Sequence, residues 1–291
     1  AARYGAVEAA LATGDFDDIV RREAPRASTD RILLAHPAAH VGLIEAQAPA
    51  EEGWAQLDPD TYMGPTSLDA ALRGAGAAVA AVDAVIAGEA TNAFIIARPP
   101  GHHAEQDRAM GFCLFNNAAI AALHAQEAHG CARVAVVDFD VHHGNGTQAI
   151  FWDREHAFFA SSHEWPQYPG TGRAEDRGLF DQVCNVPLAR GEGGSEFRRA
   201  WGETLLPALD DFSPDFIVIS AGFDGHAADP LGGLLLSEAD FDWVTKEIQG
   251  IAASCCDGRL VSVLEGGYDL EALGKSAAAH LKALATSDQI G

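Results

Sequence analysis

Four ionisable residues, Asp138, Asp140, His142 and His143, lie within six positions at the end of a short apolar run. The valine-rich run at 134–137 predicts a buried parallel strand. Because side chains alternate along a strand, we expect Asp138, Asp140 and His142 to project to one side where the strand ends. Two carboxylates and an imidazole at such a place can bind a divalent metal ion. A single aspartate there could be a strand cap, but four ionisable groups favour metal binding.

Three other predicted strands also end in residues that could do chemistry. The segments that follow them contain the pair His102 and His103, then Asp224, then Tyr268. Ligands of open α/β sheets bind beyond the carboxyl ends of the strands, so these segments are expected to converge. Each segment alone could be an ordinary turn, and the functional prediction depends on their combination.

This combination predicts a mononuclear metal hydrolase. Asp140, His142 and Asp224 supply three ligands and leave one position for water, as catalytic zinc sites do. The metal would lower the pKa of that water and polarise a carbonyl group. His102 and His103 would act as general acid and base, a contribution of roughly 10²–10⁴-fold in rate.

Three more residues complete the predicted site. Tyr268 would donate a hydrogen bond to the oxyanion that develops during acyl transfer. Asp138 and Asn145 remain to orient the two imidazole rings of the histidine pair.

The elements that must position these residues alternate between strand and helix. Short apolar runs predict strands at 32–35, 94–97, 134–138, 157–161, 183–186, 216–220 and 260–264. Amphipathic patterns and N-cap residues predict helices over 1–30, from Ser67 to a stop at Gly88, over 115–128, from Ser195, from Ser237 and from Asp269 onward. The alternation predicts a single α/β domain over residues 1–291, with a mostly parallel sheet and helices on both faces. The segment 49–66 is expected to be a surface loop in which Asp58 and Asp60 are solvated.

The chain is strongly acidic, since 19 basic and 42 acidic residues give a formal net charge of −23. This argues strongly against binding to nucleic acid through its phosphates. No apolar run approaches the ~20 residues that span a bilayer, so no membrane insertion is expected. The absence of a charged-then-apolar leader, together with five scattered cysteines lacking CxxC spacing, predicts a cytoplasmic protein. The oligomeric state stays open, and a homo-oligomer is among the options.

Six motifs together resemble the signature set of the histone deacetylase family, and they occur in the same order. They are Arg98-Pro-Pro-Gly-His-His-Ala104, Gly111-Phe-Cys-Leu-Phe-Asn116, Asp138-Phe-Asp-Val-His-His-Gly-Asn-Gly146, Tyr168-Pro-Gly-Thr-Gly172, Ser220-Ala-Gly-Phe-Asp224 and Glu265-Gly-Gly-Tyr268. The resemblance covers about residues 30–285. It implies the arginase/deacetylase α/β fold and zinc-dependent removal of an acyl group from an amine.

The resemblance implies the same zinc ligands and the same role for Tyr268 as the residues themselves suggest. It also pairs His102 with Asp138 and His103 with Asn145, and it favours His103 as the general base. Two further sites come from the resemblance alone. The walls of a narrow acyl-amine tunnel would be Gly111, Phe112, Tyr168 and Leu231. The ligands of a structural potassium ion would be Asp138, Asp140, His142, Ser161 and Ser162, and a second potassium ion is common in the family.

Two residues depart from common family patterns. Asn145 stands where nuclear class I members carry Asp, so the chain looks more like the class II and bacterial branch. Tyr168 stands where many members have Phe, which adds a hydroxyl to the tunnel wall. Because that branch includes small-amide hydrolases, the expected substrates are acetyl-lysine, acetylpolyamines and other small amides.

Two alternatives use the same residues differently. An arginase-like hydrolase with two manganese ions would need carboxylates that bridge a second metal, and the run 141–145 supplies none. A non-catalytic binder of acetylated ligands would be expected to lack a metal ligand or Tyr268, and all of these residues are present. Counting metal ions per chain separates the first alternative, and an assay of hydrolysis separates the second.

Overall fold

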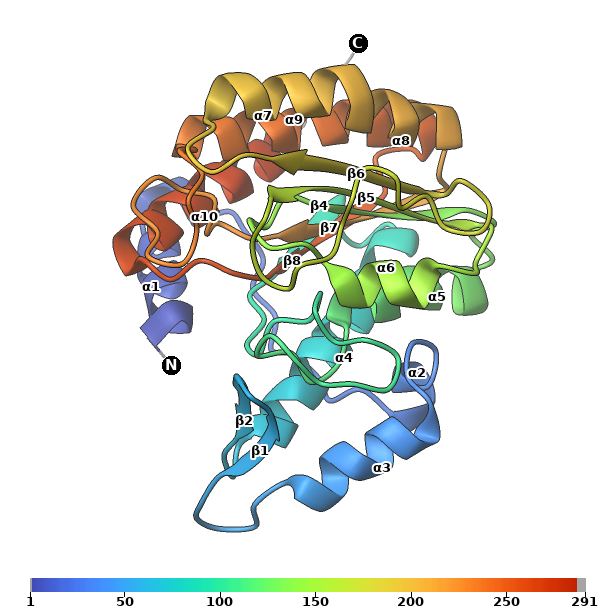
Figure 1. Cartoon of the computed structure of the whole chain (residues 1–291), viewed down its shortest axis with the longest axis vertical. Helices are drawn as coiled ribbons and strands as arrows, with labels where there is room; N and C mark the ends of the chain where they lie inside the picture. The colour runs from blue at the N-terminus through green and yellow to red at the C-terminus, as the bar shows by residue number, and fades with distance from the viewer. Residues whose placement is uncertain (1, 287–291) are drawn as a thin grey trace.

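The computed structural model describes residues 2–286, and its central feature is a six-stranded sheet between layers of helices (Figure 1). The strands are β3 (Asn92–Ile95), β4 (Val134–Asp138), β5 (Ala157–Glu164), β6 (Val183–Leu188), β7 (Phe216–Ala221) and β8 (Leu260–Leu264). Their order is β3-β8-β7-β4-β5-β6, and every neighbouring pair is parallel. β4, β7 and β8 are buried along their whole length, because apolar runs of this kind need cover on both faces. The predicted parallel α/β architecture is confirmed.

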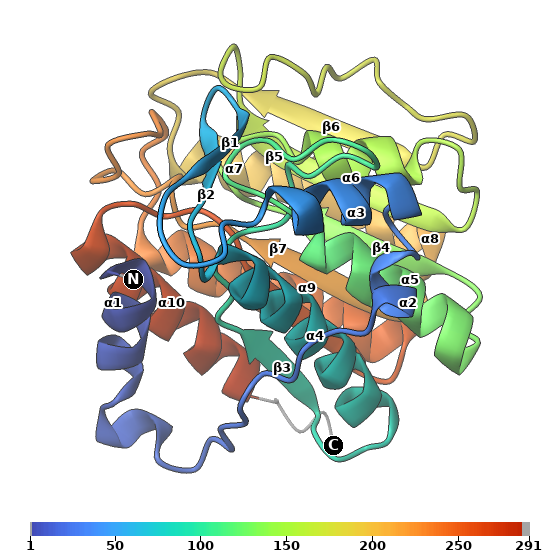
Figure 2. The same cartoon turned by 90° about the horizontal axis from the view of Figure 1, so that it is seen from below.

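Helices cover both faces of this sheet (Figures 1 and 2). One side carries α1 (Ala2–Leu11), the short turn η1 (Gly14–Phe16), α7 (Gly194–Ala200), the π-helical turn η2 (Trp201–Leu205), α8 (Leu206–Phe212), α9 (Glu238–Cys255) and α10 (Leu270–Ala285). The other side carries α2 (Thr29–Ile32), α3 (Ala38–Gln47), α4 (Ser67–Ile86), α5 (Asn117–His129) and α6 (Asn145–Phe151). Each layer packs its own apolar core against the sheet, which holds the strand ends in fixed register.

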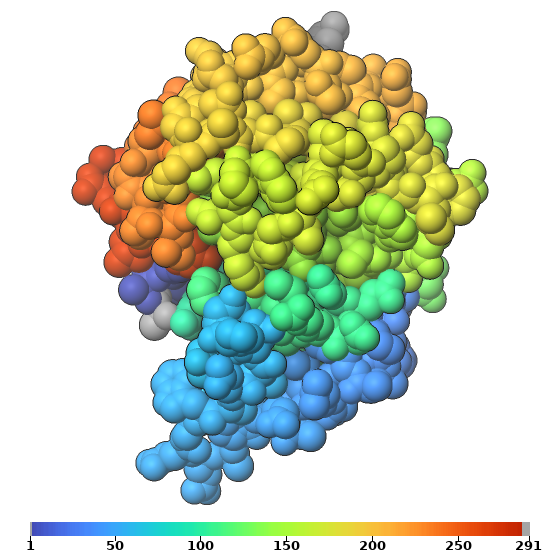
Figure 3. Space-filling view, in the orientation of Figure 1, coloured from blue at the N-terminus to red at the C-terminus, as the bar shows by residue number. Residues whose placement is uncertain are grey.

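A small antiparallel hairpin lies outside the main sheet. Its strands are β1 (Ala55–Asp58) and β2 (Thr61–Met63). Together with α3 it forms the narrow lower end of the molecule (Figures 1 and 3). The predicted surface loop over 49–66 is therefore interrupted by two short strands, although most of its residues are at least partly exposed. In β2 only Tyr62 is exposed between two buried residues, an alternation too short to be recognised in the sequence.

Two local predictions were wrong. Residues 32–35 do not form a strand, because Ile32 ends the helical turn α2 and is fully buried. An apolar run of four residues looks the same in a strand and in a buried helical turn. The helix predicted over 1–30 is limited to α1, η1 and the start of α2, and residues 17–28 contain no helix.

The remaining elements are confirmed with small shifts of their ends. β3 begins and ends two residues before the predicted 94–97, and α7 begins at Gly194 rather than after Ser195. The predicted capping box of Ser237 is present at the start of α9, and the Asp269 side chain caps α10. Local capping chemistry is therefore well encoded in the sequence.

Candidate active site

The loops that follow four strands meet at the carboxyl edge of the sheet, as predicted. β8, β7 and β4 are direct neighbours, and the segments after them carry Tyr268 and the three predicted metal ligands. β3 is the other neighbour of β8, and the loop after it brings His102 and His103 to the same edge. The strand order therefore gathers residues that lie far apart in the sequence.

Asp140, His142 and Asp224 form one compact cluster. Their candidate ligand atoms all lie within 4.8 Å of one another. The Nδ1 atom of His142 is 3.2 Å from Asp140 Oδ1 and 3.1 Å from Asp224 Oδ2. Both carboxylates are fully buried. The structure thus brings together the three side chains that the sequence analysis selected as metal ligands.

Backbone amides and glycines hold the two carboxylates in this arrangement. Asp140 Oδ2 accepts a hydrogen bond from Gly266 N at 2.7 Å, and Asp224 Oδ1 accepts one from Val141 N at 2.9 Å. A Cβ atom at Gly266 would clash with the Asp224 carboxylate. A Cβ atom at Gly222 would clash with the Asp140 carboxylate in the same way. Only glycine, which has no side chain, leaves enough space at these two positions for the carboxylates of Asp140 and Asp224.

The electrostatics of the cluster call for a positive charge between the carboxylates. Burial and the nearby Asp140 charge raise the pKa of Asp224 to about 6. Although burial opposes it, hydrogen bonds to Asp140 and Asp224 raise the pKa of His142 to about 11. The two carboxylates thus compete for one shared proton on the imidazole. A divalent cation satisfies the same three donors better, so this donor set fits a metal ion.

The predicted histidine pair lies beside the cluster. His102 Nδ1 is 2.9 Å from Asp138 Oδ2, and His103 Nδ1 is 2.8 Å from Asn145 Oδ1, which are the expected pairings. The two rings are 4.0 Å apart between centroids. One imidazole therefore faces a carboxylate and the other a neutral amide.

The two partners give the histidines opposite protonation states. Although burial opposes the charged form, Asp138 and Asp140 raise the pKa of His102 to about 10. Burial and the charges of His102 and His142 hold the pKa of His103 well below its usual value. At neutral pH the pair therefore combines a charged imidazole with a neutral one.

Two carboxylates that the sequence analysis did not assign hold this pair in place. Asn145 Nδ2 donates to Glu105 Oε1 at 2.7 Å, so the amide oxygen of Asn145 is turned toward His103. Glu265 Oε2 accepts hydrogen bonds from Gly101 N at 2.6 Å and His102 N at 3.1 Å. The position of Glu265 directly after the apolar run 260–264, at the head of the Glu265-Gly-Gly-Tyr268 motif, was the sequence signal that could have found it.

A cavity of about 240 Å³ opens above the cluster. Its lining residues are Asp60, His103, Gly111, Phe112, His142, Gln167, Tyr168, Leu231 and Tyr268. All four residues expected to form a tunnel wall are among them. His103 lines the cavity, whereas His102 is not part of its wall. Burial and the charges of Asp224 and Asp140 raise the pKa of Tyr268 well above its usual value, so its hydroxyl stays a hydrogen-bond donor.

Asp60, which the sequence placed in a solvated loop, is part of the cavity wall. Its Oδ1 atom accepts hydrogen bonds from Gly111 N at 3.1 Å and from the Thr61 hydroxyl at 2.8 Å. Gly111 and Phe112 both have positive φ values, of 57° and 66°. The hairpin thus supports a turn that places the half-exposed Phe112 at the cavity rim.

Two other acidic residues hold the opposite wall. Glu164 is buried, and it accepts a hydrogen bond from Gly233 N at 2.6 Å. Asp229 Oδ1 accepts from Leu231 N at 2.9 Å, while its Oδ2 accepts from Tyr268 N at 2.6 Å. Asp229 therefore links the wall residue Leu231 to the backbone of Tyr268, a role that the sequence analysis missed.

The residues that the resemblance associates with potassium lie at adjacent strand ends. Ser161 pairs with Asp138 across β5 and β4. The Ser161 hydroxyl is 2.9 Å from His163 Nδ1, and the Ser162 hydroxyl accepts from Trp201 Nε1 at 2.9 Å. Both hydroxyls therefore have a partner within the protein.

Within residues 2–286, no helix has the length and apolar character required to cross a membrane.

Comparison with known proteins identifies similar sequences over nearly the whole chain. The family model described as the histone deacetylase domain matches residues 1–284. A histone deacetylase-like amidohydrolase from Pseudomonas aeruginosa is 44% identical over 252 residues, covering 85% of this chain and 66% of the relative. The chloroplastic histone deacetylase 10 of Oryza sativa is 42% identical over 264 residues, covering 87% of this chain and 60% of the relative. The chain thus spans under two thirds of the length of these two relatives.

Two further matches cover a larger share of the protein to which this chain is compared. A probable deacetylase from Methanothermobacter thermautotrophicus is 41% identical over 288 residues, covering 96% of this chain and 84% of the relative. The crystal structure of the HDA15 HD domain superimposes with a TM-score of 0.91 at 36% identity, covering 97% of this chain and 80% of that one. The structural match confirms the expected arginase/deacetylase fold.

Proposed function

The chain belongs to the histone deacetylase family, and we propose that it is a zinc-dependent hydrolase that removes an acetyl or other acyl group from an amine nitrogen. The proposed substrates are acetyl-lysine, acetylpolyamines or small amides. One observation supports the proposal above all others: a single cavity exposes the metal-type donor His142, the neutral imidazole of His103 and the phenol of Tyr268. These are the groups that amide hydrolysis requires.

Asp140, His142 and Asp224 are the proposed zinc ligands. When bound there, zinc supplies a Lewis acid that lowers the pKa of a water molecule and polarises the amide carbonyl. Three protein donors leave an open position, which is the composition of catalytic rather than structural zinc sites. We also propose that one or two potassium ions bind behind this site, one of them at Asp138, Asp140, His142, Ser161 and Ser162.

His103 is the proposed general base. It lines the cavity, and its low pKa leaves it free to take a proton from the attacking water. The same proton can then pass to the amine nitrogen as the amide C–N bond breaks, so the products are a carboxylate and an amine. His102 stays charged beside Asp138, where its positive charge offsets the buried carboxylates.

A panel of substrates tests this proposal. The zinc-loaded protein is assayed for kcat/KM with acetyl-lysine peptides, acetylpolyamines and small acylamides. Hydrolysis of at least one class is expected, and the ranking identifies the preferred amine. Binding of all three classes without hydrolysis of any would instead favour a non-catalytic binder.

Tyr268→Phe is expected to lower kcat by roughly 10²–10³-fold with little change in KM, because the lost hydrogen bond strengthens only as the oxyanion forms. Steady-state kinetics measure both parameters. Tyr62→Phe is the matched control, since Tyr62 is half-exposed on the hairpin and its hydroxyl contacts only the Pro59 carbonyl at 3.4 Å. An unchanged kcat in Tyr268→Phe would remove this residue from the mechanism.

Hydrolysis of cationic acetylamines is expected to slow as the salt concentration rises, whereas neutral amides should respond little. The chain carries a net charge of −23, and screening shortens from ~10 Å at 0.1 M to ~3 Å at 1 M. Rates for an acetylpolyamine and a neutral acylamide across this range measure the effect. Equal salt responses would assign the acidic surface to solubility alone.

The carboxylate of Asp60 is the charge in the cavity wall through which this effect should act. Asp60→Asn keeps an acceptor for Gly111 N and should lower kcat/KM for the cationic substrate roughly fivefold, equivalent to about 1 kcal/mol. Asp58→Asn is the control, because Asp58 pairs with Arg108 at 2.6 Å and does not line the cavity.

A further inference from the structure

A second cluster of metal-type side chains lies on two helices outside the cavity. Asp83 of α4 and the residues His124 and His129 of α5 place three donor atoms within 4.8 Å of one another. Among residues 2–286, this group and the Asp140 cluster are the two sets of this kind. None of its members lines the cavity, so the chemistry proposed above does not account for it.

The two imidazoles of this cluster point at the same place. The Nε2 atoms of His124 and His129 both lie 2.7 Å from Asp83 Oδ1. The rings are nearly perpendicular, at 86°, with centroids 5.2 Å apart. The Nε2 lone pairs of the two histidines can therefore point at one position. In this structure Asp83 Oδ1 occupies that position, and Asp83 is the third potential ligand.

The three side chains differ in solvent exposure in a way that suits ion capture. The His124 side chain is only 3% exposed and is held in the helix interface, whereas the Asp83 side chain is 51% exposed and can turn toward solvent. The His129 side chain is 23% exposed and belongs to the last residue of α5. One rigid ligand and two accessible ones allow an ion to enter from solvent without opening the core.

No hydrogen bond from any described residue to the Nδ1 atom of His124 fixes which ring nitrogen carries the proton. Within the described chain its buried Nδ1 atom has no hydrogen-bond partner. His102 and His103 differ in this respect, because a side-chain oxygen holds each Nδ1 atom. Nε2 of His124 can therefore act as a hydrogen-bond donor to Asp83 or as a metal ligand.

We propose that Asp83, His124 and His129 form a surface metal site that binds a transition ion such as Zn²⁺ or Cu²⁺ and ties α4 to α5. Two imidazoles and one carboxylate are ligands that these ions accept, with nitrogen distances of about 2.0–2.1 Å. Asp83 has only to withdraw its oxygen from between the rings and bind the ion from the solvent side. The bound ion would link residues that are 41 and 46 positions apart, and so stabilise the folded chain.

Metal titration of the zinc-loaded protein tests this site. After removal of free metal, calorimetry with added Zn²⁺ should show one further equivalent per chain, and the thermal unfolding temperature should rise. In a separate sample, the electron paramagnetic resonance spectrum of one added equivalent of Cu²⁺ should show coupling to two imidazole nitrogens. No further equivalent of either ion in the wild-type protein would overturn the proposal.

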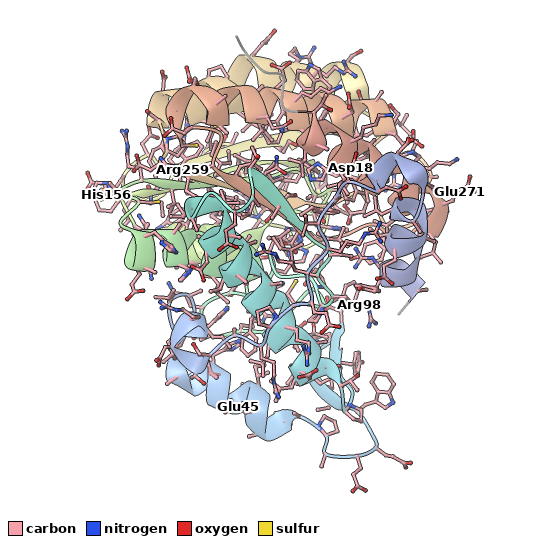
Figure 4. The ribbon with its side chains drawn as sticks, turned by 180° about the vertical axis from the view of Figure 1, so that it is seen from behind. Asp18, Glu45, Arg98, His156, Arg259 and Glu271 are labelled. Carbon is pink, nitrogen blue, oxygen red and sulfur yellow. The ribbon has the colours of Figure 1, made fainter. Side chains whose placement is uncertain are left out.

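Three variants assign the extra equivalent. Asp83→Asn and His129→Gln should each abolish it while leaving folding and hydrolysis intact, because both side chains lie at the surface. His156→Ala is the matched control, since His156 is an exposed histidine outside the cluster (Figure 4), and it should keep the equivalent. Retention of the equivalent in Asp83→Asn and His129→Gln would also overturn the proposal. If the wild-type protein hydrolysed no substrate, only the proposed function would be contradicted, because the two sites share no residue.

Discussion

Asp224→Ala is expected to lose the proposed zinc ion and amide hydrolysis together. The side chain supplies one of three donors, and its removal leaves His142 and Asp140 as an incomplete set. The loss in kcat/KM should exceed ~100-fold, the upper range for changing an outer-shell partner of a metal. Metal content per chain after dialysis and steady-state kinetics measure the two effects, and full zinc with full activity would contradict the assignment.

Two comparisons exclude unfolding as the cause of this loss. Asp224→Asn keeps an acceptor for Val141 N, so it should fold like the wild-type protein yet still bind zinc poorly. Asp242→Ala removes an ordinary ion-paired carboxylate, 2.8 Å from Lys246 on α9, and should keep both zinc and activity. Thermal unfolding of all three variants completes the comparison.

His103→Ala is expected to lower kcat by roughly 10²–10⁴-fold, the range for removal of a general base. His102→Ala should cost less, because His102 does not line the cavity and is held charged by Asp138. The reason for the difference is the partner of each Nδ1 atom: an amide oxygen leaves His103 neutral, and a carboxylate keeps His102 protonated.

The comparison of these two variants must be made on metal-loaded protein, so zinc content is measured in both. A His102→Ala loss that equals or exceeds the His103→Ala loss would reverse the assignment of the base. His143→Ala is not a suitable control, because His143 contacts Gln148 and Thr171 in the core. His156→Ala, at the surface, is the neutral reference.

Local sequence patterns were sufficient for the central strands and for the residues at their ends. β4 and β8 begin and end where the apolar runs predicted, because a strand buried on both faces leaves a continuous apolar signal bounded by polar or glycine residues. Asp140, His142 and Asp224 were identifiable because parallel strands bring their carboxyl ends to one edge. Helix starts such as Ser237 were identifiable because capping depends on residues only three positions apart.

Two short segments were predicted wrongly because they contain too few residues to show a periodicity. The run at Ile32 is too short for its periodicity to separate a strand from a helical turn, and β2 has only three residues. The zinc and potassium assignments, the tunnel wall and the choice of His103 as base came from family resemblance or from combined motifs rather than from any one pattern.

The sequence by itself therefore determined the α/β class, the parallel sheet and the set of ionisable side chains gathered at its edge. Only the tertiary structure decided that Asp60 lines the cavity, that Glu164 is buried and that Asp229 links Leu231 to Tyr268. Only the packing of α4 on α5 places Asp83 beside two histidines. Apart from the local contact of Asp229 with Leu231, these contacts join residues 39 to 69 positions apart and depend on how whole elements pack. Periodicity and capping report on neighbours within a few residues, so they carry no signal of these contacts.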